Sequence, residues 1–245
     1  MTGLALVGLD CGRMRTQRRT LIADGGREEI SIPILAWLIR HPDGDVVFDV
    51  GLHPALATDS SSLGELTKLF AVDLDVGGTV GPRHAERGVD PLSGLIVVLS
   101  HCHFDHCGGL EELPNARILV HRDEWMAASA GGGGYDPSLI DHGHDVIHLD
   151  REHDVFGDGT VVCFPTPGHT CGHQSLRVRT ASGTVILAGD ACYFGHTLDD
   201  ELLPPFAFDL DTQRRSLQVL QRARAAGATI VPGHDATVFR DLTHD

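Results

Sequence analysis

The stretch of sequence that decides the fold reads Leu95-Ile96-Val97-Val98-Leu99-Ser100-His101-Cys102-His103-Phe104-Asp105-His106-Cys107-Gly108-Gly109. Its first five residues are apolar and three are β-branched, which predicts a buried strand. The strand leads into a polar turn that carries four metal-binding types of side chain. His101 and His103 alternate in an extended segment, so both imidazoles point to one side and can reach the same ion. Asp105 and His106 follow where we expect the chain to bend, so they can face a neighbouring position.

Three further apolar runs lead to a metal-binding type of side chain with a glycine immediately before it. They are residues 161–164 before Gly168-His169, residues 184–188 before Gly189-Asp190, and residues 229–231 before Gly233-His234. A glycine leaves room for a metal ion beside the backbone. A lone histidine after a strand is more often a surface or core residue, but four such strand ends in one chain predict a metal site.

Seven side chains of this kind suit two ions better than one, because a catalytic zinc needs three protein ligands and a water. Two ions about 3.5 Å apart can share a carboxylate and a hydroxide, and Asp190 is the natural bridge. We expect His101, His103 and His169 at the first ion, and Asp105, His106 and His234 at the second. We expect two divalent ions, with zinc as the first choice, although such sites also accept iron, cobalt or manganese.

The composition fits one globular domain over residues 1–245, with 42% hydrophobic residues and a mean hydropathy of −0.02. Asp and Glu number 34 against 19 Lys and Arg, a formal charge of −15. A surface this acidic repels phosphates, so we expect neither nucleic acid nor an anionic membrane as a partner. No apolar run approaches the roughly 18 residues that span a bilayer.

The N-terminus lacks a basic n-region, so we expect no signal peptide and a cytoplasmic location. The six cysteines are then interpreted as reduced thiols rather than three disulfides. Four of them lie within two residues of an expected ligand. Cys192 could itself be a metal ligand, but Asp190 already supplies the expected one, so we prefer a small buried thiol there.

Apolar and β-branched runs predict strands over residues 4–9, 32–39, 46–50, 95–99, 117–120, 161–164, 175–178, 184–188 and 229–231. Helical patterns cover residues 62–72, 122–130 and 212–226, the last capped by Gly227. The order is neither a strict βαβ series nor all-β, and sheets in layers with helices outside fit it. The glycine tract 131–134 is either a flexible surface loop or a mobile rim near the active site.

These residues resemble the metallo-β-lactamase superfamily, and the likeness spans nearly the whole chain. It begins at residues 46–51, which end in Asp49-Val50-Gly51, and takes in all the expected ligands. The resemblance implies an α+β fold, an αββα sandwich of four layers with two mixed sheets, helices outside and the metals at the sheet edges. It also implies that Asp49 accepts a hydrogen bond from a metal-binding histidine; the alternative is a plain turn residue.

Within the superfamily the sequence is similar to N-acyl homoserine lactonases and related γ-butyrolactone hydrolases. The likeness lies in His103-Phe104-Asp105-His106, Gly172-His173-Gln174-Ser175, Asp190-Ala191-Cys192-Tyr193 and residues 203–209. In that group a tyrosine three residues after the bridging aspartate contacts the substrate carbonyl. The resemblance implies this role for Tyr193; the alternative is a packing residue whose hydroxyl has a partner.

The resemblance implies a quorum-quenching lactonase in which a metal-bridging hydroxide attacks the lactone carbonyl. Tyr193 would stabilise the oxyanion, and Asp105 would pass a proton to the departing ring oxygen or serve only as a ligand. An acyl chain needs an apolar channel, for which the candidates are Met14, Trp37, Phe104, Phe206 and Phe208; each fits an ordinary core equally well. The family also suggests a homodimer through residues 54–88.

Other hydrolases of this fold act on thioesters, β-lactams or phosphodiesters, and they are the main alternative. Residues 167–173 also resemble thioester hydrolases of the glyoxalase II type, but we expect no room after His234 for their helical extension. A metal or redox protein without hydrolytic activity is a rival from another class, although this sequence shows neither the flavodoxin domain nor the varied ligand pattern of the flavin-linked members. A purely structural zinc site is a weaker rival, because such sites close with four ligands and favour cysteine.

Overall fold

The computed structural model describes residues 4–238 and arranges their strands in two mixed sheets. The seven-stranded sheet has the order β4-β1-β2-β3-β5-β6-β7 and the five-stranded sheet the order β12-β11-β10-β9-β8. The strands are β1 (Ala5–Gln17), β2 (Glu29–Arg40), β3 (Val46–Phe48), β4 (Ala71–Asp73), β5 (Ile96–Val98), β6 (Arg117–His121), β7 (Asp145–Leu149), β8 (His153–Asp154), β9 (Val161–Pro165), β10 (Gln174–Thr180), β11 (Gly183–Leu187) and β12 (Thr229–Val231). Strands β3, β5, β6 and β7 run parallel, as do β11 and β12, and the other pairs are antiparallel.

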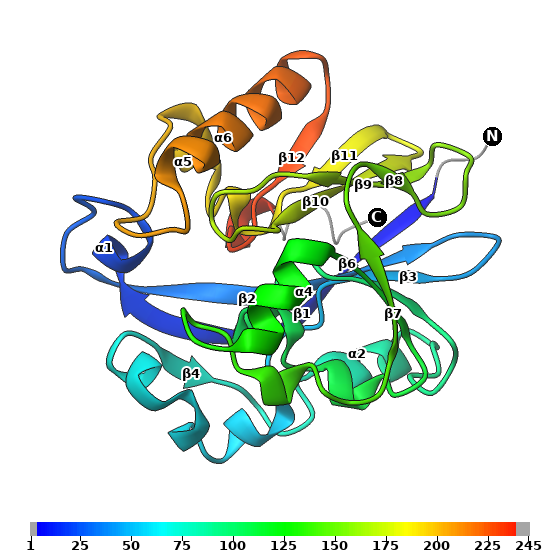
Figure 1. Cartoon of the computed structure of the whole chain (residues 1–245), viewed down its shortest axis with the longest axis horizontal. Helices are drawn as coiled ribbons and strands as arrows, with labels where there is room; N and C mark the ends of the chain where they lie inside the picture. The colour runs from blue at the N-terminus through cyan, green and yellow to red at the C-terminus, as the bar shows by residue number, and fades with distance from the viewer. Residues whose placement is uncertain (1–3, 239–245) are drawn as a thin grey trace.

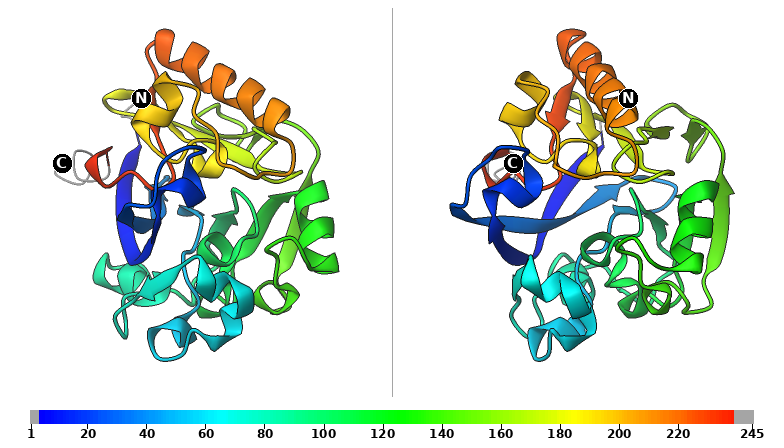
Figure 2. Two further views of the ribbon diagram at one scale, coloured as in Figure 1. Left: turned by 90° about the vertical axis from the view of Figure 1, so that its left-hand side faces the viewer. Right: turned by 60° about the vertical axis from the view of Figure 1, so that its left-hand side comes forward.

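Helices lie outside the two sheets, which gives four layers (Figure 1). The α-helices are α1 (Arg18–Leu21), α2 (Val80–Glu86), α3 (Phe104–Cys107), α4 (Arg122–Ala130), α5 (Gly195–Asp199) and α6 (Leu210–Ala225). The 3-10 helices are η1 (Pro54–Ala57), η2 (Ser61–Lys68), η3 (Leu110–Glu112), η4 (Pro137–Leu139) and η5 (Gly189–Ala191). Figure 2 shows α5 and α6 on one side of the molecule, with the cyan and green segments of residues 50–130 on the other. The expected sandwich of two mixed sheets with outer helices is confirmed.

Alternate residues of the central strands serve two different cores, as the period of two in a strand requires. Val98 of β5 lies between the sheets, in a cluster with Leu176 of β10 and Val231 of β12. Its neighbours Val97 and Leu99 belong instead to the cluster on the outer face of the seven-stranded sheet. The strands are therefore covered on both faces, which explains their unbroken apolar runs.

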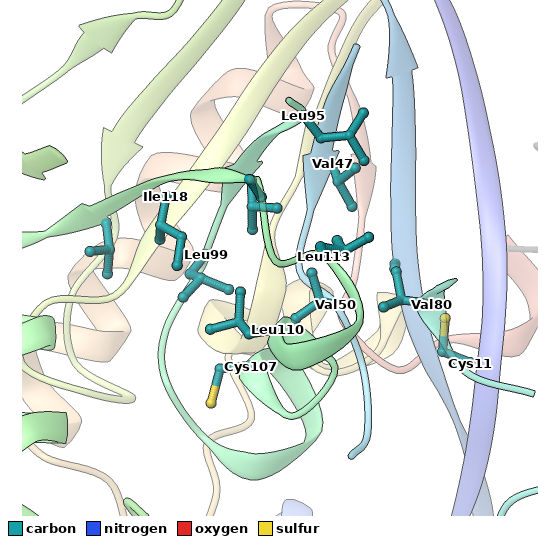
Figure 3. Close-up of a cluster of buried hydrophobic side chains, with 14 of the residues drawn as sticks. Cys11, Val47, Val50, Val80, Leu95, Leu99, Cys107, Leu110, Leu113 and Ile118 are labelled. Carbon is teal, nitrogen blue, oxygen red and sulfur yellow. The ribbon is translucent and has the colours of Figure 1, made fainter. Parts of the chain in front are cut away.

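The outer cluster also anchors the loop that follows β5. Figure 3 shows Leu99, Leu110 and Cys107 gathered in this cluster. Cys107, at the end of α3, is fully buried, and its Sγ donates to the carbonyl of Cys102 at 3.3 Å. The loop that carries the first four candidate ligands is thus fixed to the core at both ends.

All nine expected strands are present, but the expected helix over residues 62–72 is wrong. The chain forms η2 as far as Lys68, with a break at Gly64 (φ 53°), and then enters β4, where Val72 pairs with Met14 of β1. Pairing with the long strand β1 outweighs the weak helical pattern. The helices over 122–130 and 212–226 are confirmed as α4 and α6, and Gly227 follows with φ 99°. Within residues 4–238, no helix has both the length and the apolar character needed to cross a membrane.

Candidate active site

The seven expected ligands meet at one end of the two sheets, each placed by the end of a strand. His101 and His103 follow β5, and Asp105 and His106 lie in the short helix α3. From the five-stranded sheet, β9 leads to His169, β11 to Asp190 in η5, and β12 to His234. Residues up to 133 positions apart in the sequence therefore converge as the strand-end pattern predicts.

The first group consists of three ring nitrogens that face one another. His101 Nε2 lies 3.0 Å from His103 Nδ1 and 3.2 Å from His169 Nε2. His169 Nε2 and His103 Nδ1 are also 3.0 Å apart. Burial, followed by the neighbouring imidazoles, holds the pKa of His101 well below its usual range. Neutral imidazole is the form that binds metals.

Asp190 lies between this group and a second one. Its Oδ2 is 3.4 Å from His169 Nε2, on the side of the first group. Its Oδ1 is 3.2 Å from Nε2 of both His106 and His234. Asp105 completes the second group, with Oδ2 3.6 Å from His106 Nε2 and 3.7 Å from His234 Nε2. One carboxylate thus offers an oxygen to each group, as a bridge requires.

The donor set fits two divalent cations. His101, His103 and His169 form one group whose ligand atoms all lie within 4.8 Å of one another, and Asp105, His106 and His234 form another. His106 Nε2 and Asp190 Oδ1 are both buried, and although they lie 3.2 Å apart neither makes a hydrogen bond within the described residues. A buried ring nitrogen or carboxylate oxygen without a partner costs free energy, which a coordinated cation removes.

The opposite nitrogens of these histidines are held by hydrogen bonds that set the tautomer. His106 Nδ1 lies 2.8 Å from Asp49 Oδ2, and His234 Nδ1 lies 2.9 Å from the carbonyl of Pro33. The Ser100 hydroxyl donates to Asp49 at 2.8 Å and lies 3.0 Å from His101 Nδ1. In each case the nitrogen that faces the centre is left free to bind a cation.

Asp49 lies beside a candidate metal-binding histidine, His106, as the resemblance implies. Two opposing effects act on its pKa. Burial raises the pKa of Asp49, whereas His106 and the hydrogen bonds from Ser100 lower it, and the net shift is upward. Its backbone lies in the left-handed region (φ 57°), which is uncommon for a residue with a side chain. Sequence reasoning missed Ser100 and the Pro33 carbonyl; only the position of Ser100 beside the first ligand hinted at its role.

Tyr193 lies beside the first group. Its hydroxyl oxygen is 3.1 Å from His169 Nδ1, and its ring stacks on His234 at 5.8 Å between centroids. Burial, and then the carboxylates of Asp190 and Asp105, raise the pKa of Tyr193 well above its usual value. The hydroxyl therefore stays protonated and can donate a hydrogen bond toward the open cavity.

A cavity of about 540 Å³ opens onto this centre. Several candidate ligands and Tyr193 line it, together with the apolar side chains of Met14, Phe104, Phe206 and Phe208. The fifth channel candidate, Trp37, does not line it and packs between the two sheets. Gly133 and Gly134 line the same cavity, so the glycine tract lies at the edge of the site.

Cys192 is a buried thiol in the structure, as preferred. Its Sγ lies 3.3 Å from the carbonyl of Phe194, and the metal-binding groups of the described residues do not include it. All six cysteines are free.

A family model of the metallo-beta-lactamase superfamily matches residues 32–234. The chain belongs to the metallo-beta-lactamase superfamily. The resemblance stated from the sequence is therefore confirmed, and with it the four-layer fold.

Curated relatives in this superfamily match almost the whole chain. N-acyl homoserine lactonase AttM of Rhizobium radiobacter is 34% identical, over 99% of this chain and 97% of the relative. The protein of the same name from Rhizobium johnstonii is 33% identical, over 98% and 96%. N-acyl homoserine lactonase of Bacillus thuringiensis is 30% identical, over 84% and 82%.

Solved structures agree on the fold. A structure described as an N-acyl homoserine lactone hydrolase with N-hexanoyl-L-homoserine bound at its catalytic metal centre has a TM-score of 0.89. The two chains are 24% identical, with 98% of this chain and 97% of the other covered. The dizinc quorum-quenching lactonase AidC has a TM-score of 0.72 and 16% identity, with 96% of this chain and 89% of the other covered.

Proposed function

We propose that this protein hydrolyses the lactone ring of N-acyl homoserine lactones and so degrades quorum-sensing signals. One observation carries the proposal: Tyr193 lies beside a centre of five histidines and two aspartates. The relatives that match this chain over 98% and 99% of its length are named N-acyl homoserine lactonases. The apolar cavity in front of that centre supports a substrate with an acyl chain.

His101, His103 and His169 would hold one cation, Asp105, His106 and His234 the other, and Asp190 both. Two divalent cations bound there supply a Lewis acid for the lactone carbonyl and lower the pKa of a coordinated water toward neutrality. We propose zinc as the native metal, supported by the His/Asp donors and by a dizinc lactonase of the same fold.

We propose that Tyr193 stabilises the charge that develops on the carbonyl oxygen. With His169 Nε2 facing the centre, Nδ1 carries the ring proton and donates to the Tyr193 oxygen. The Tyr193 O–H remains free to donate to the substrate. A donor fixed in this way stabilises the transition state more than the ground state, because the negative charge is complete only there.

Asp105 is the proposed proton carrier. It is 6% exposed and lines the cavity, so its carboxylate can reach both the centre and a bound ring. We propose that it takes the proton of the attacking water and delivers it to the ring oxygen as the C–O bond breaks. It would do so while also serving as a ligand of the second cation.

Hydrolysis of four substrate classes by one metal-replete sample tests the function. We expect N-hexanoyl homoserine lactone to be opened to N-hexanoyl-homoserine, with one proton released per turnover, at a kcat/KM at least about 10²-fold above that for nitrocefin, an acyl thioester or a phosphodiester. If a thioester, β-lactam or phosphodiester is hydrolysed faster than the lactone, the protein is a hydrolase of that substrate class instead.

We also propose a homodimer and a cytoplasmic location. Six free thiols, five of them buried, suit a reducing compartment. The homodimer through residues 54–88 is proposed by analogy with the family. A mass measured by light scattering in solution decides between one chain and two.

A further inference from the structure

Glu124 is a buried acid that the proposed reaction does not use. It lies in the first turn of α4 and is 0% exposed. Glutamate is almost never fully buried unless it has partners, and within residues 4–238 no ion pair includes this side chain. Its burial therefore calls for another explanation.

The two carboxylate oxygens of Glu124 accept hydrogen bonds from two different loops. Oε1 accepts from the backbone N–H of Cys102 at 2.9 Å, and Oε2 accepts from the backbone N–H of Gly172 at 3.1 Å. Cys102 lies between His101 and His103, in the loop after β5 of the seven-stranded sheet. Gly172 lies three residues after His169, in the loop after β9 of the five-stranded sheet. One side chain thus joins the loops that supply all three ligands of the first group.

The fit at Gly172 shows how close this contact is. A Cβ added at Gly172 would lie 2.3 Å from the backbone nitrogen of Glu124 and 2.6 Å from its Cβ. The loop after β9 can approach α4 only because residue 172 has no side chain. Only a side chain with two acceptor oxygens can satisfy both N–H groups, and the N-terminal end of α4 favours a negative charge at this position.

Tyr135 lines the cavity and lies close to the same carboxylate. Its ring lies 5.3 Å from the ring of His103. Burial, and then the charge of Glu124 together with a hydrogen bond to it, raise the pKa of the Tyr135 hydroxyl. Glu124 thus lies close to a residue whose ring packs against a candidate ligand.

We propose that Glu124 is a positioning residue that fixes the loops after β5 and β9 relative to each other and so sets the metal affinity of the first group, His101, His103 and His169. The inference rests on the two-ion site of the proposed function. It predicts a selective effect, because Asp105, His106 and His234 are held by other contacts, including Asp49 and the Pro33 carbonyl.

Titration of the metal-free full chain with Zn²⁺ alone, against a chromophoric chelator, tests this inference without any substrate. Glu124→Gln keeps the size of the side chain but places an NH₂ group against one of the two backbone donors. We expect one of the two ions to bind at least about 10-fold more weakly and the other to bind as in the unchanged protein. Asp123→Asn removes an exposed charge from the same helix turn and is expected to leave both affinities unchanged.

Repeating the titration in two variants, each of which lacks a ligand of one group, identifies which ion is weakened. In a His234→Ala protein, which keeps the first group intact, adding Glu124→Gln should weaken the remaining ion. In a His169→Ala protein, which keeps the second group, the same change should have no effect. If Glu124→Gln does not fold, Glu124→Asp, which keeps the charge but is shorter by one methylene, should show the same selective loss.

A merely structural role predicts a different pattern. Glu124→Gln would then lower the Tm of the metal-free protein while leaving both Zn²⁺ affinities unchanged, or would weaken both ions alike. Either result overturns the inference. Because no lactone enters the titration, its outcome does not depend on which substrate the enzyme hydrolyses.

Discussion

The hydroxyl oxygen of Tyr193 lies 3.1 Å from Nδ1 of His169. The contact links the proposed oxyanion donor to a proposed metal ligand. It fixes the direction of the hydroxyl without placing that hydroxyl in either metal-binding group.

Tyr193→Phe should therefore slow turnover without loss of metal. Removing one donor to a developing oxyanion costs about 10²-fold or more in kcat, and the aromatic ring that packs on His234 is retained. The measurements are kcat for lactone opening and metal per chain on the same preparation. Equal kcat in the two proteins would remove Tyr193 from the mechanism.

Asp49→Asn should weaken the second cation. The substitution replaces one carboxylate oxygen by an NH₂ group beside His106 Nδ1 and the Ser100 hydroxyl, which lie 2.8 Å from Asp49 Oδ2. Loss of such a supporting group costs about 10- to 100-fold in metal affinity. Zn²⁺ titration of the metal-free protein measures it, with Asp45→Asn, which only breaks an ion pair to Arg40, as the control. Unchanged Zn²⁺ affinity in Asp49→Asn would show that Asp49 is a plain turn residue.

The convergence of the candidate ligands could be predicted from the sequence because each of them follows a strand in the chain itself. For His169 and His234, a strand followed by a glycine was a sufficient signal. The pairing of those strands within the sheet then brings the two side chains to the same end of the fold. The supporting contacts could not be predicted in the same way. The Pro33 carbonyl that holds His234 comes from 201 positions away, and Glu124 joins two loops that meet only when the sheets have packed.

The error over residues 62–72 has a similar origin. Leu63, Leu66 and Leu69 have helical spacing, but Gly64 breaks the turn and the long strand β1 extends far enough to pair with residues 71–73. A local sequence pattern cannot show that residues 71–73 pair with a strand that lies far away in the sequence. By contrast, α6 has both a helical face and a capping Asp209 whose side chain accepts from Thr212 N at 2.7 Å, so local signals were sufficient.

Gly168→Ala should be far more disruptive than Gly183→Ala, although both glycines have nearly the same φ (131° and 132°). A Cβ at residue 168 would lie 2.2 Å from the backbone nitrogen of Gln213, whereas nothing lies within 4 Å of one at residue 183. Gly183→Ala should cost only backbone strain of about 1–3 kcal/mol. Gly168→Ala adds a clash with α6 beside His169, so the free energy of unfolding in urea should fall further. Equal losses in the two variants would contradict the predicted clash.

Two buried thiols should make the protein less stable at alkaline pH. Burial, with Asp10 adding to it at Cys11, raises the pKa of Cys11 and of Cys163 to about 12, from 9.0. Between these values the unfolded chain releases thiol protons that the folded chain keeps. Stability is therefore full below about pH 9 and falls as the pH rises toward 12, by about 1.4 kcal/mol per unit for each thiol.

Urea unfolding of metal-free protein at about pH 8 and about pH 10 checks this effect. Between the two pH values, the free energy of unfolding of the double variant Cys11→Ala/Cys163→Ala should fall by about 3 kcal/mol less than that of the unchanged protein. All other titrating groups are the same in the two proteins. A variant with the same alkaline loss as the unchanged protein would show that these thiols ionise equally in both states.

The central claim is that two cations held by seven side chains form the hydrolytic centre. Stepwise addition of Zn²⁺ to the metal-free protein, with N-hexanoyl homoserine lactone hydrolysis measured at each step, tests it most directly. We expect activity to be absent without metal and to reach its plateau at two ions per chain, with Asp190→Ala binding neither ion firmly. Full lactone hydrolysis by metal-free protein, or a plateau at one ion per chain, would contradict the account.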